Sequence, residues 1–173
     1  DKARAEELFN VKLTKPTATV IWTTTPWTIP ANQALNFSPD LDYVVVETPH
    51  RNFILAEGLY EDALKRYGLE GKVIGKAKGS DLYHLRFKHP LAGLDKGYDR
   101  FSPVIIADYV DATAGTGIVH SAPAYGVDDY VSCKKDGLTN DEILNPVQAD
   151  GVYASWLPMF AGLNVWKAQP KIL

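Results

Sequence analysis

Short β-branched and aromatic runs, separated by proline, glycine and other turn formers, recur along this chain and constrain its fold more than any other feature. They predict strands at 17–25, 42–48, 52–56, 72–77, 83–88, 103–110 and 116–120. Thirteen glycines and eleven prolines break up the connections between these runs. We therefore expect an α+β, mainly β domain, barrel-like and closed or nearly closed, with a few peripheral helices at its rim.

Helical periodicity is clear at only two places. Residues 59–67 have acids early and bases late, and Gly68 follows as a C-cap, which predicts one helix. A second helix is predicted over 127–135, because acids come first, lysines come last and Gly137 supplies a stop.

Size and charge limit the class of protein. At 173 residues and 46% hydrophobic, the chain has enough apolar side chains for the core of one domain, which we expect to cover residues 1–173. A net charge of −3 is unlike that of proteins that grip nucleic acid through a broad basic face, so any such contact must be local. The single cysteine, Cys133, excludes an internal disulfide framework and favours a cytoplasmic location.

No apolar run reaches the length that a membrane helix needs, and the first residues do not resemble a signal peptide. The chain starts at Asp1 rather than at an initiator methionine. We expect a domain excised from a larger protein, and a monomer.

The stretch 22–30 places three threonines directly before a proline. The preceding β-branched run predicts a strand, and Pro26 can neither donate to a sheet ladder nor leave Thr25 helical. Thr23 and Thr25 should then share one face, with Thr24 on the other. These hydroxyls are candidate ligands for a polar substrate, although a threonine triplet alone is also ordinary strand sequence.

A second stretch, 115–129, combines a Gly-Thr-Gly turn, an apolar run that ends at His120, a proline-bent loop and the acid start of a predicted helix. His120 and Asp129 are nine positions apart and are candidates to face one cleft. The alternative is a satisfied buried imidazole and a carboxylate that complements the helix dipole. Paired-cysteine zinc patterns, His-Glu-x-x-His, a phosphate loop and a Gly-x-Ser-x-Gly elbow are all absent.

Taken together, residues 23–32 and 115–130 closely resemble the editing domain of isoleucyl-tRNA synthetase, the CP1 insertion of a class I aminoacyl-tRNA synthetase. The resemblance extends over nearly the whole chain. The related valyl and leucyl enzymes carry an arginine before the proline of the threonine motif, where this chain has Thr25. One departure is 124–126, Ala-Tyr-Gly here, where many bacterial relatives have Gly-His-Gly.

The resemblance implies an aminoacyl-tRNA deacylase that removes valine from isoleucine tRNA, and possible hydrolysis of valyl-adenylate. One methylene in an apolar pocket discriminates by only about 1–3 kcal/mol, a limit for which this synthetase is itself the standard example, so a second site must remove the error. The implied partners are the 3′ end of isoleucine tRNA carrying valine, valyl-adenylate and the rest of the parent synthetase. No cofactor or metal is expected for this domain, while the parent uses ATP and Mg.

On this interpretation Asp129 binds the α-ammonium of the substrate. Thr24 and Thr25 hydrogen-bond the ribose, the ester or the attacking water, and Thr23 shapes the strand end. His120 is either a general base or a steric wall, and we favour the wall.

Two tryptophans complete the predicted site. Trp22 and Trp27 are candidate walls of the substrate site, although both are equally suited to the core. Two other classes of function stay open: a non-catalytic module that binds an RNA 3′ end, and a general small esterase or peptidase.

Overall fold

The computed structural model describes all residues from 1 to 173, and they form two compact units. Each unit is assembled from three separate stretches of the chain. The first contains Asp1–Trp22, Leu35–Phe87 and Pro103–Val119, and the second contains Thr23–Ala34, Lys88–Ser102 and His120–Leu173. The prediction of one domain over 1–173 stays a prediction.

The elements are short, as the frequent turn residues require. The strands are β1 (Thr17–Thr19), β2 (Ala34–Phe37), β3 (Asp42–Glu47), β4 (Asn52–Ala56), β5 (Lys72–Lys78), β6 (Arg86–Lys88), β7 (Phe101–Ile106) and β8 (Ile118–Ser121). The α-helices are α1 (Lys2–Leu8), α2 (Tyr60–Tyr67), α3 (Val127–Lys135) and α4 (Val165–Ile172). The 3₁₀ helices are η1 (Pro26–Ala31), η2 (Glu57–Leu59), η3 (Gly79–Leu82), η4 (Lys96–Tyr98) and η5 (Asn140–Glu142). None of the helices combines the length and hydrophobicity that a membrane crossing requires.

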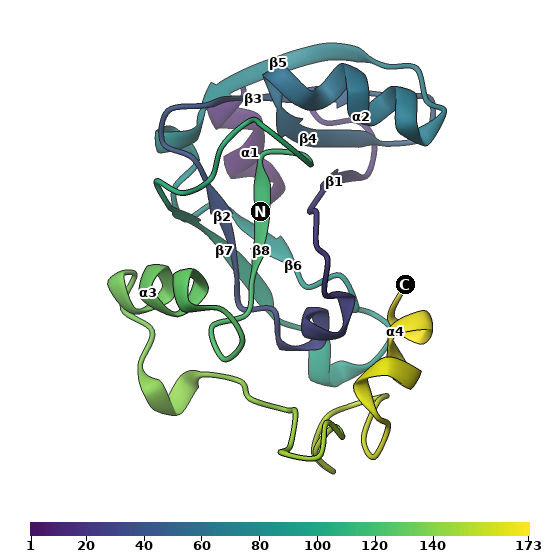
Figure 1. Ribbon diagram of the computed structural model, residues 1–173. Coiled ribbons are helices and arrows are strands. Elements are labelled where there is room, and N and C mark those ends of the chain that lie inside the picture. The colour runs from purple at the N-terminus through teal and green to yellow at the C-terminus, as the bar shows by residue number, and fades with distance from the viewer. The chain divides into compact units, whose positions relative to one another are not determined.

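The first sheet lies in the first unit and has the order β1-β4-β3-β5. Strand β3 is antiparallel to β4 and β5, whereas β1 runs parallel to β4. Helix α2 covers one face, where Val44 and Val46 pack against Ala63 and Leu64 (Figure 1). Because side chains alternate along a strand, the neighbouring residues of β3 are buried on the opposite face.

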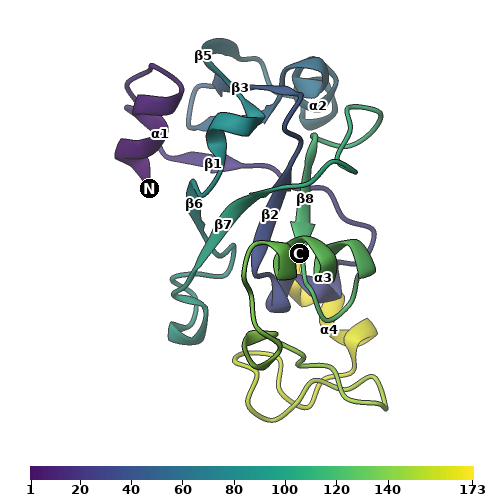
Figure 2. The same ribbon diagram turned by 90° about the vertical axis from the view of Figure 1, so that its left-hand side faces the viewer.

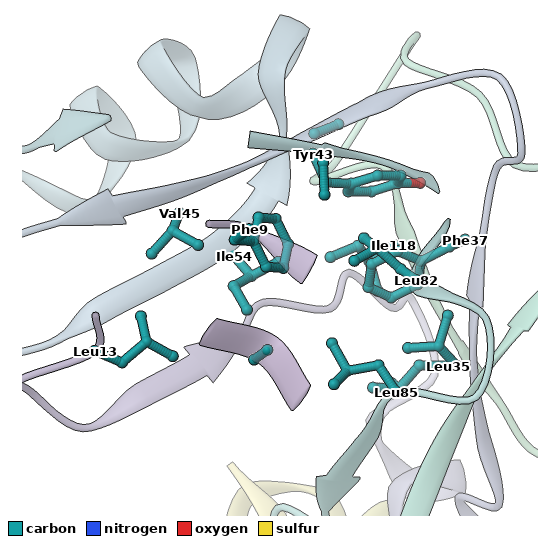
Figure 3. Close-up of a cluster of buried hydrophobic side chains, with 14 residues drawn as sticks. Phe9, Leu13, Leu35, Phe37, Tyr43, Val45, Ile54, Leu82, Leu85 and Ile118 are labelled. Atoms are coloured by element: carbon teal, nitrogen blue, oxygen red, sulfur yellow. The ribbon is translucent and has the colours of Figure 1, made fainter. Parts of the chain in front are cut away.

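That opposite face forms the main core of the first unit. Tyr43 and Val45 of β3 meet Ile54 of β4, Phe9 from the segment after α1, and Ile118 at the start of β8 (Figure 3). All of these side chains are fully or almost fully buried. The first residue of β8, the strand that also contains His120, is therefore anchored in this core.

The second sheet has the order β6-β7-β2-β8, and β2 runs parallel to β7 (Figure 2). Its four strands each have residues in both units. In the first unit Leu35 pairs with Val104 and Phe37 pairs with Ile106.

The α+β class is confirmed, but a closed barrel is not found. The strand pairings give two four-stranded sheets, each with two edge strands. Several predicted strands end early because short polar or 3₁₀ segments replace them. The strand predicted over 17–25 covers only Thr17–Thr19, with an isolated bridge at Trp22, since the backbone turns into η1 at Pro26.

Among the strands and α-helices, sequence reasoning missed three elements. All four residues of β2 are buried, so the strand shows no alternation of apolar and polar residues. Helix α4 contains Pro170, which argues against a helix. Helix α1 has only seven residues, too few for a clear periodic pattern.

Candidate active site

The Gly-Thr-Gly turn before β8 is fixed by two glycines with positive φ. Gly117 has φ of +71°, and a Cβ on it would lie 2.5 Å from the Cβ of Ala56. The hydroxyl of Tyr43 donates to the carbonyl of Gly117 at 2.6 Å, and burial raises the pKa of Tyr43 to about 12. Only glycine fits this turn, which sets the direction in which β8 leaves it.

The threonine loop of the second unit is an ordered turn rather than a strand. The Thr23 hydroxyl accepts a hydrogen bond from the backbone N–H of Thr25 at 3.0 Å, and the two hydroxyl oxygens lie 3.4 Å apart. Such a side-chain turn is a common alternative to sheet pairing for threonine. Thr24 and Thr25 are exposed, whereas Thr23 is half-buried. Thr23 therefore shapes the loop, and its two neighbours are accessible.

The loop leads into η1, whose carbonyls are held by side chains from distant parts of the second unit. His89 Nε2 lies 2.9 Å from the carbonyl of Ile29, and Arg100 Nη2 donates to the carbonyl of Pro30 at 2.7 Å and to that of Asn32 at 3.2 Å. The Tyr153 hydroxyl donates to the carbonyl of Trp27. These bonds replace the helical partners that carbonyls near the end of a short helix lack.

His120 is buried, and both of its ring nitrogens have partners. Its Nε2 lies 2.7 Å from the Thr28 hydroxyl, and its Nδ1 lies 2.7 Å from the side-chain nitrogen of Asn32. Thr28 belongs to η1, next to the threonine loop. The two motifs, about ninety residues apart in sequence, therefore meet in a direct buried contact.

The direction of each hydrogen bond around His120 follows from its neighbours. The Asn32 nitrogen also donates to the carbonyl of Ala34, which can only accept, so the amide orientation is set. His120 Nδ1 must then accept, and its proton resides on Nε2. The Nε2–H group therefore donates to the Thr28 hydroxyl. This hydroxyl in turn donates to the carbonyl of Thr25 at 2.9 Å.

This arrangement holds His120 neutral. A proton on Nδ1 would face the Asn32 N–H group, and burial by itself lowers the pKa of His120 from 6.5 to about 4. Both nitrogens are engaged, so the ring is suited to a fixed wall rather than to taking a proton from water.

Asp129 lies in the first turn of α3, as predicted. Its carboxylate accepts a hydrogen bond from the backbone N–H of Ala122 at 2.9 Å, two residues after His120. A Cβ on Gly126 would lie 2.9 Å from the Asp129 carboxyl carbon, so a larger residue there would displace the carboxylate. Asp129 therefore ties α3 to the loop that follows β8.

The two predicted tryptophans belong to different units. Trp27 is half-buried, with its ring edge-on to Tyr125 at 5.2 Å between centroids. Trp22 lies in the first unit, where its side chain is 51% exposed. It covers the glycine turn, because a Cβ on Gly115 would lie 2.9 Å from its own Cβ.

Within the second unit, hydrogen bonds through Thr28 link His120 to Thr25 and so to Thr23. Asp129 bonds the loop two residues after His120, and Thr24 and Trp27 lie in the threonine loop and in η1. Sequence reasoning missed the residues that hold these side chains. Thr28 and Asn32 were inside the recognised stretch, but nothing in the sequence pointed to Ser102, whose hydroxyl donates to the Asn32 side-chain oxygen.

A pocket of about 220 Å³ lies elsewhere in the second unit, and none of the predicted site residues lines it. Its walls include Pro30, Arg100 and Trp156. No group of three or more His, Cys, Asp or Glu side chains is arranged to hold a metal ion. The expectation that the domain needs no cofactor stays a prediction.

No protein-family model matches the chain. Over 159 residues it is 57% identical to the isoleucine–tRNA ligase of Cupriavidus necator, a match that covers 92% of the chain and 16% of that protein. It is 56% identical over 174 residues to the isoleucine–tRNA ligase of Pseudomonas fluorescens, with 100% of the chain and 18% of that protein covered. The chain therefore spans less than a fifth of the length of these relatives.

Solved structures with a similar fold are CP1 and editing domains. The chain matches GlLeuRS-CP1 with a TM-score of 0.74 and 19% identity, covering 99% of this chain and 85% of that one. It matches the editing domain of the P. falciparum cytosolic leucyl-tRNA synthetase with a TM-score of 0.62 and 12% identity, covering 91% and 76%. At sequence identities of 19% and 12%, these matches show a shared fold and no more. The chain belongs to the isoleucine–tRNA ligase family, as the segment that covers the CP1 editing-domain region.

Proposed function

We propose that this chain is an editing deacylase that hydrolyses valine wrongly esterified to the 3′ end of isoleucine tRNA, and also valyl-adenylate. The observation that carries the proposal is the buried contact between His120 and Thr28, because it joins the two motifs at one place. The parent synthetase supplies the rest of the tRNA contact and the ATP- and Mg-dependent activation step.

In this mechanism the His120 ring limits the volume open to the side chain of the amino acid. Both nitrogens are engaged with Thr28 and Asn32, so the ring is held at a fixed angle. Valine fits and isoleucine, one methylene larger, is refused. The Nδ1 lone pair of the His120 ring is engaged and its pKa of about 4 makes it a weak base, so we assign the proton transfer to the ribose hydroxyl beside the ester. As water forms the new C–O bond, this hydroxyl passes the water's proton to the leaving ribose oxygen, which releases free valine and the tRNA hydroxyl.

Asp129 binds the α-ammonium of the substrate by a charge-assisted hydrogen bond. Thr24 and Thr25 are exposed and hydrogen-bond the ester, the ribose or the attacking water, whereas Thr23 holds their loop. Trp27 walls the adenosine or aminoacyl group.

The test is deacylation of valyl- and isoleucyl-tRNA for isoleucine by this chain, with Asp129→Asn as the key variant. Asparagine retains an oxygen for the N–H of Ala122 but removes the negative charge. We expect wild type to cleave only the valyl ester, and the variant to lose about 10- to 100-fold in rate at low substrate, the size of one charged hydrogen bond.

The control is Asp128→Asn, which removes the neighbouring exposed charge of α3 and should leave the rate within about twofold. Binding of an RNA 3′ end without turnover would favour the non-catalytic module instead. Cleavage of simple aryl esters with no preference for valine would favour a general esterase.

The same assay on His120→Ala separates the two roles of the histidine. A wall predicts that the variant gains activity on isoleucyl-tRNA. A general base predicts loss of activity on both esters and no gain.

A further inference from the structure

Ser102 lies at the far end of the hydrogen-bond chain that reaches the threonine loop. It is the second residue of β7, and both its side chain and that of Asn32 are buried. The Asn32 nitrogen is committed to His120 and to the carbonyl of Ala34, so the amide oxygen faces Ser102. An amide oxygen can only accept, and the serine hydroxyl must therefore donate.

From Ser102 every bond runs in one direction. Its hydroxyl donates to Asn32, Asn32 donates to His120 Nδ1, His120 Nε2–H donates to Thr28, and Thr28 donates to the carbonyl of Thr25. Side chains that form such chains constrain one another, since the reversal of one bond requires the reversal of the next.

We propose that Ser102 is a positioning residue that, together with the carbonyl of Ala34, holds the Asn32 amide and with it the Nε2–H tautomer of His120, and thereby the selectivity of the acyl site. This inference rests on the proposed function. Ser102 does not touch the substrate and acts only through Asn32 and His120.

Removal of the serine hydroxyl would leave the Asn32 oxygen buried with no donor. The carbonyl of Ala34 still favours the present orientation of the amide, but the unpaired oxygen reduces this preference, so in a fraction of the molecules the amide oxygen turns toward His120, whose Nδ1 then carries the proton. His120 Nε2 becomes an acceptor, and Thr28 must turn its hydroxyl away from the carbonyl of Thr25. The His120 ring and the first turn of η1 would thus both lose hydrogen bonds that hold them in place.

The experiment is a pair of measurements on wild type and on Ser102→Ala. Long-range ¹H–¹⁵N correlation spectra identify which ring nitrogen of His120 carries the proton, with His120→Gln used to assign the signals. Deacylation of valyl- and isoleucyl-tRNA gives the selectivity ratio. We expect wild type to show only the Nε2–H form, and Ser102→Ala to show the Nδ1–H form beside it and about a tenfold lower ratio, the order expected for one lost buried hydrogen bond.

Two further variants separate positioning from packing. Ser102→Thr keeps the hydroxyl and should retain both the tautomer and the selectivity. Ser121→Ala removes another fully buried serine hydroxyl of the same unit, whose contact is the sulfur of Cys133, and should leave the tautomer unchanged.

A wild-type protein with the proton on Nδ1 overturns the inference, and this measurement needs no variant to fold. So does a Ser102→Ala protein with wild-type tautomer and selectivity. If wild type cleaves neither ester, the proposed function fails, whereas the spectra still decide whether Ser102 sets the tautomer.

Discussion

At the scale of single residues, the buried histidines of the second unit make stability depend on pH. Burial is the largest cause that lowers the pKa of both His120 and His89 from 6.5 to about 4. Above pH 6.5 both are neutral in the folded and unfolded states. As pH falls from 6.5 toward 4 the unfolded chain takes up protons that the folded chain refuses, so stability is lost.

We therefore expect the free energy of unfolding to fall by about 2 kcal/mol per histidine between pH 7 and pH 5. Urea titrations at the two pH values measure this loss. In His120→Gln the loss should be about half that of wild type, because His89 remains. An equal loss in the two proteins would mean that His120 is not held neutral by the fold.

The same lowered pKa bears on the reaction. A wall that titrates near pH 4 predicts a valyl-tRNA deacylation rate with no inflection near pH 6.5, once the alkaline hydrolysis of the free ester is subtracted. A general base with an ordinary histidine pKa would lower the rate as pH falls through 6.5. The pH profile of the deacylation rate from pH 6 to pH 8 distinguishes these cases.

At the scale of elements, the turn before β8 depends on Gly117. A methyl group there adds the strain of a positive φ to a clash with Ala56, whereas Gly68, with φ of +65°, has no atom within 4 Å of the position of a Cβ. Gly68→Ala should therefore cost about 1 kcal/mol, and Gly117→Ala roughly 2–4 kcal/mol.

Chemical denaturation of the two variants measures these costs. Gly117→Ala should also reduce deacylation, since the turn directs the strand that carries His120, and Gly68→Ala should not. Equal costs would show that the backbone shifts to make room beside Ala56.

At the scale of the whole molecule, the chain crosses between the two units five times, and the four strands of the second sheet contribute residues to both. Neither unit is a single continuous stretch of the chain. The two should therefore unfold together.

A core substitution in the first unit tests this coupling. Phe37 is fully buried there, so Phe37→Ala should lower stability by about 3–5 kcal/mol. Three of the four tryptophans lie in the second unit, so tryptophan fluorescence mainly reports on that unit, while far-UV circular dichroism reports on the whole chain. The unfolding midpoints measured by the two signals should shift by the same amount. Different midpoints for fluorescence and circular dichroism would show that the two units unfold separately.

Local sequence was enough to predict the elements whose signals are carried by neighbouring residues. Helices α2 and α3 begin within one residue of the prediction and end where it places them, because acids, bases and a following glycine act over one or two turns. Strands β3 and β4 were also found, since β-branched and aromatic runs favour extended backbone. The recognised stretches 23–32 and 115–130 indicated the family before any geometry was known.

The tertiary structure alone decided how these parts serve the site. Strand β2 is extended because it is buried between two other strands, and the threonine loop leaves the sheet because η1 is held by His89, Arg100 and Tyr153. The open sheets likewise reflect pairings between distant strands that no local pattern encodes.

For His120, too, some properties follow from the sequence and others from the tertiary structure. The sequence by itself determined that a histidine follows the apolar run of the strand and that acids lie in the first turn of the following helix. Its lowered pKa comes from burial, its link to Thr25 runs through Thr28, and its tautomer follows from the contact with Asn32, which lies 88 positions earlier in the chain. Hydrogen-bond direction and burial are properties of groups that meet in space, and only the folded chain brings these groups together.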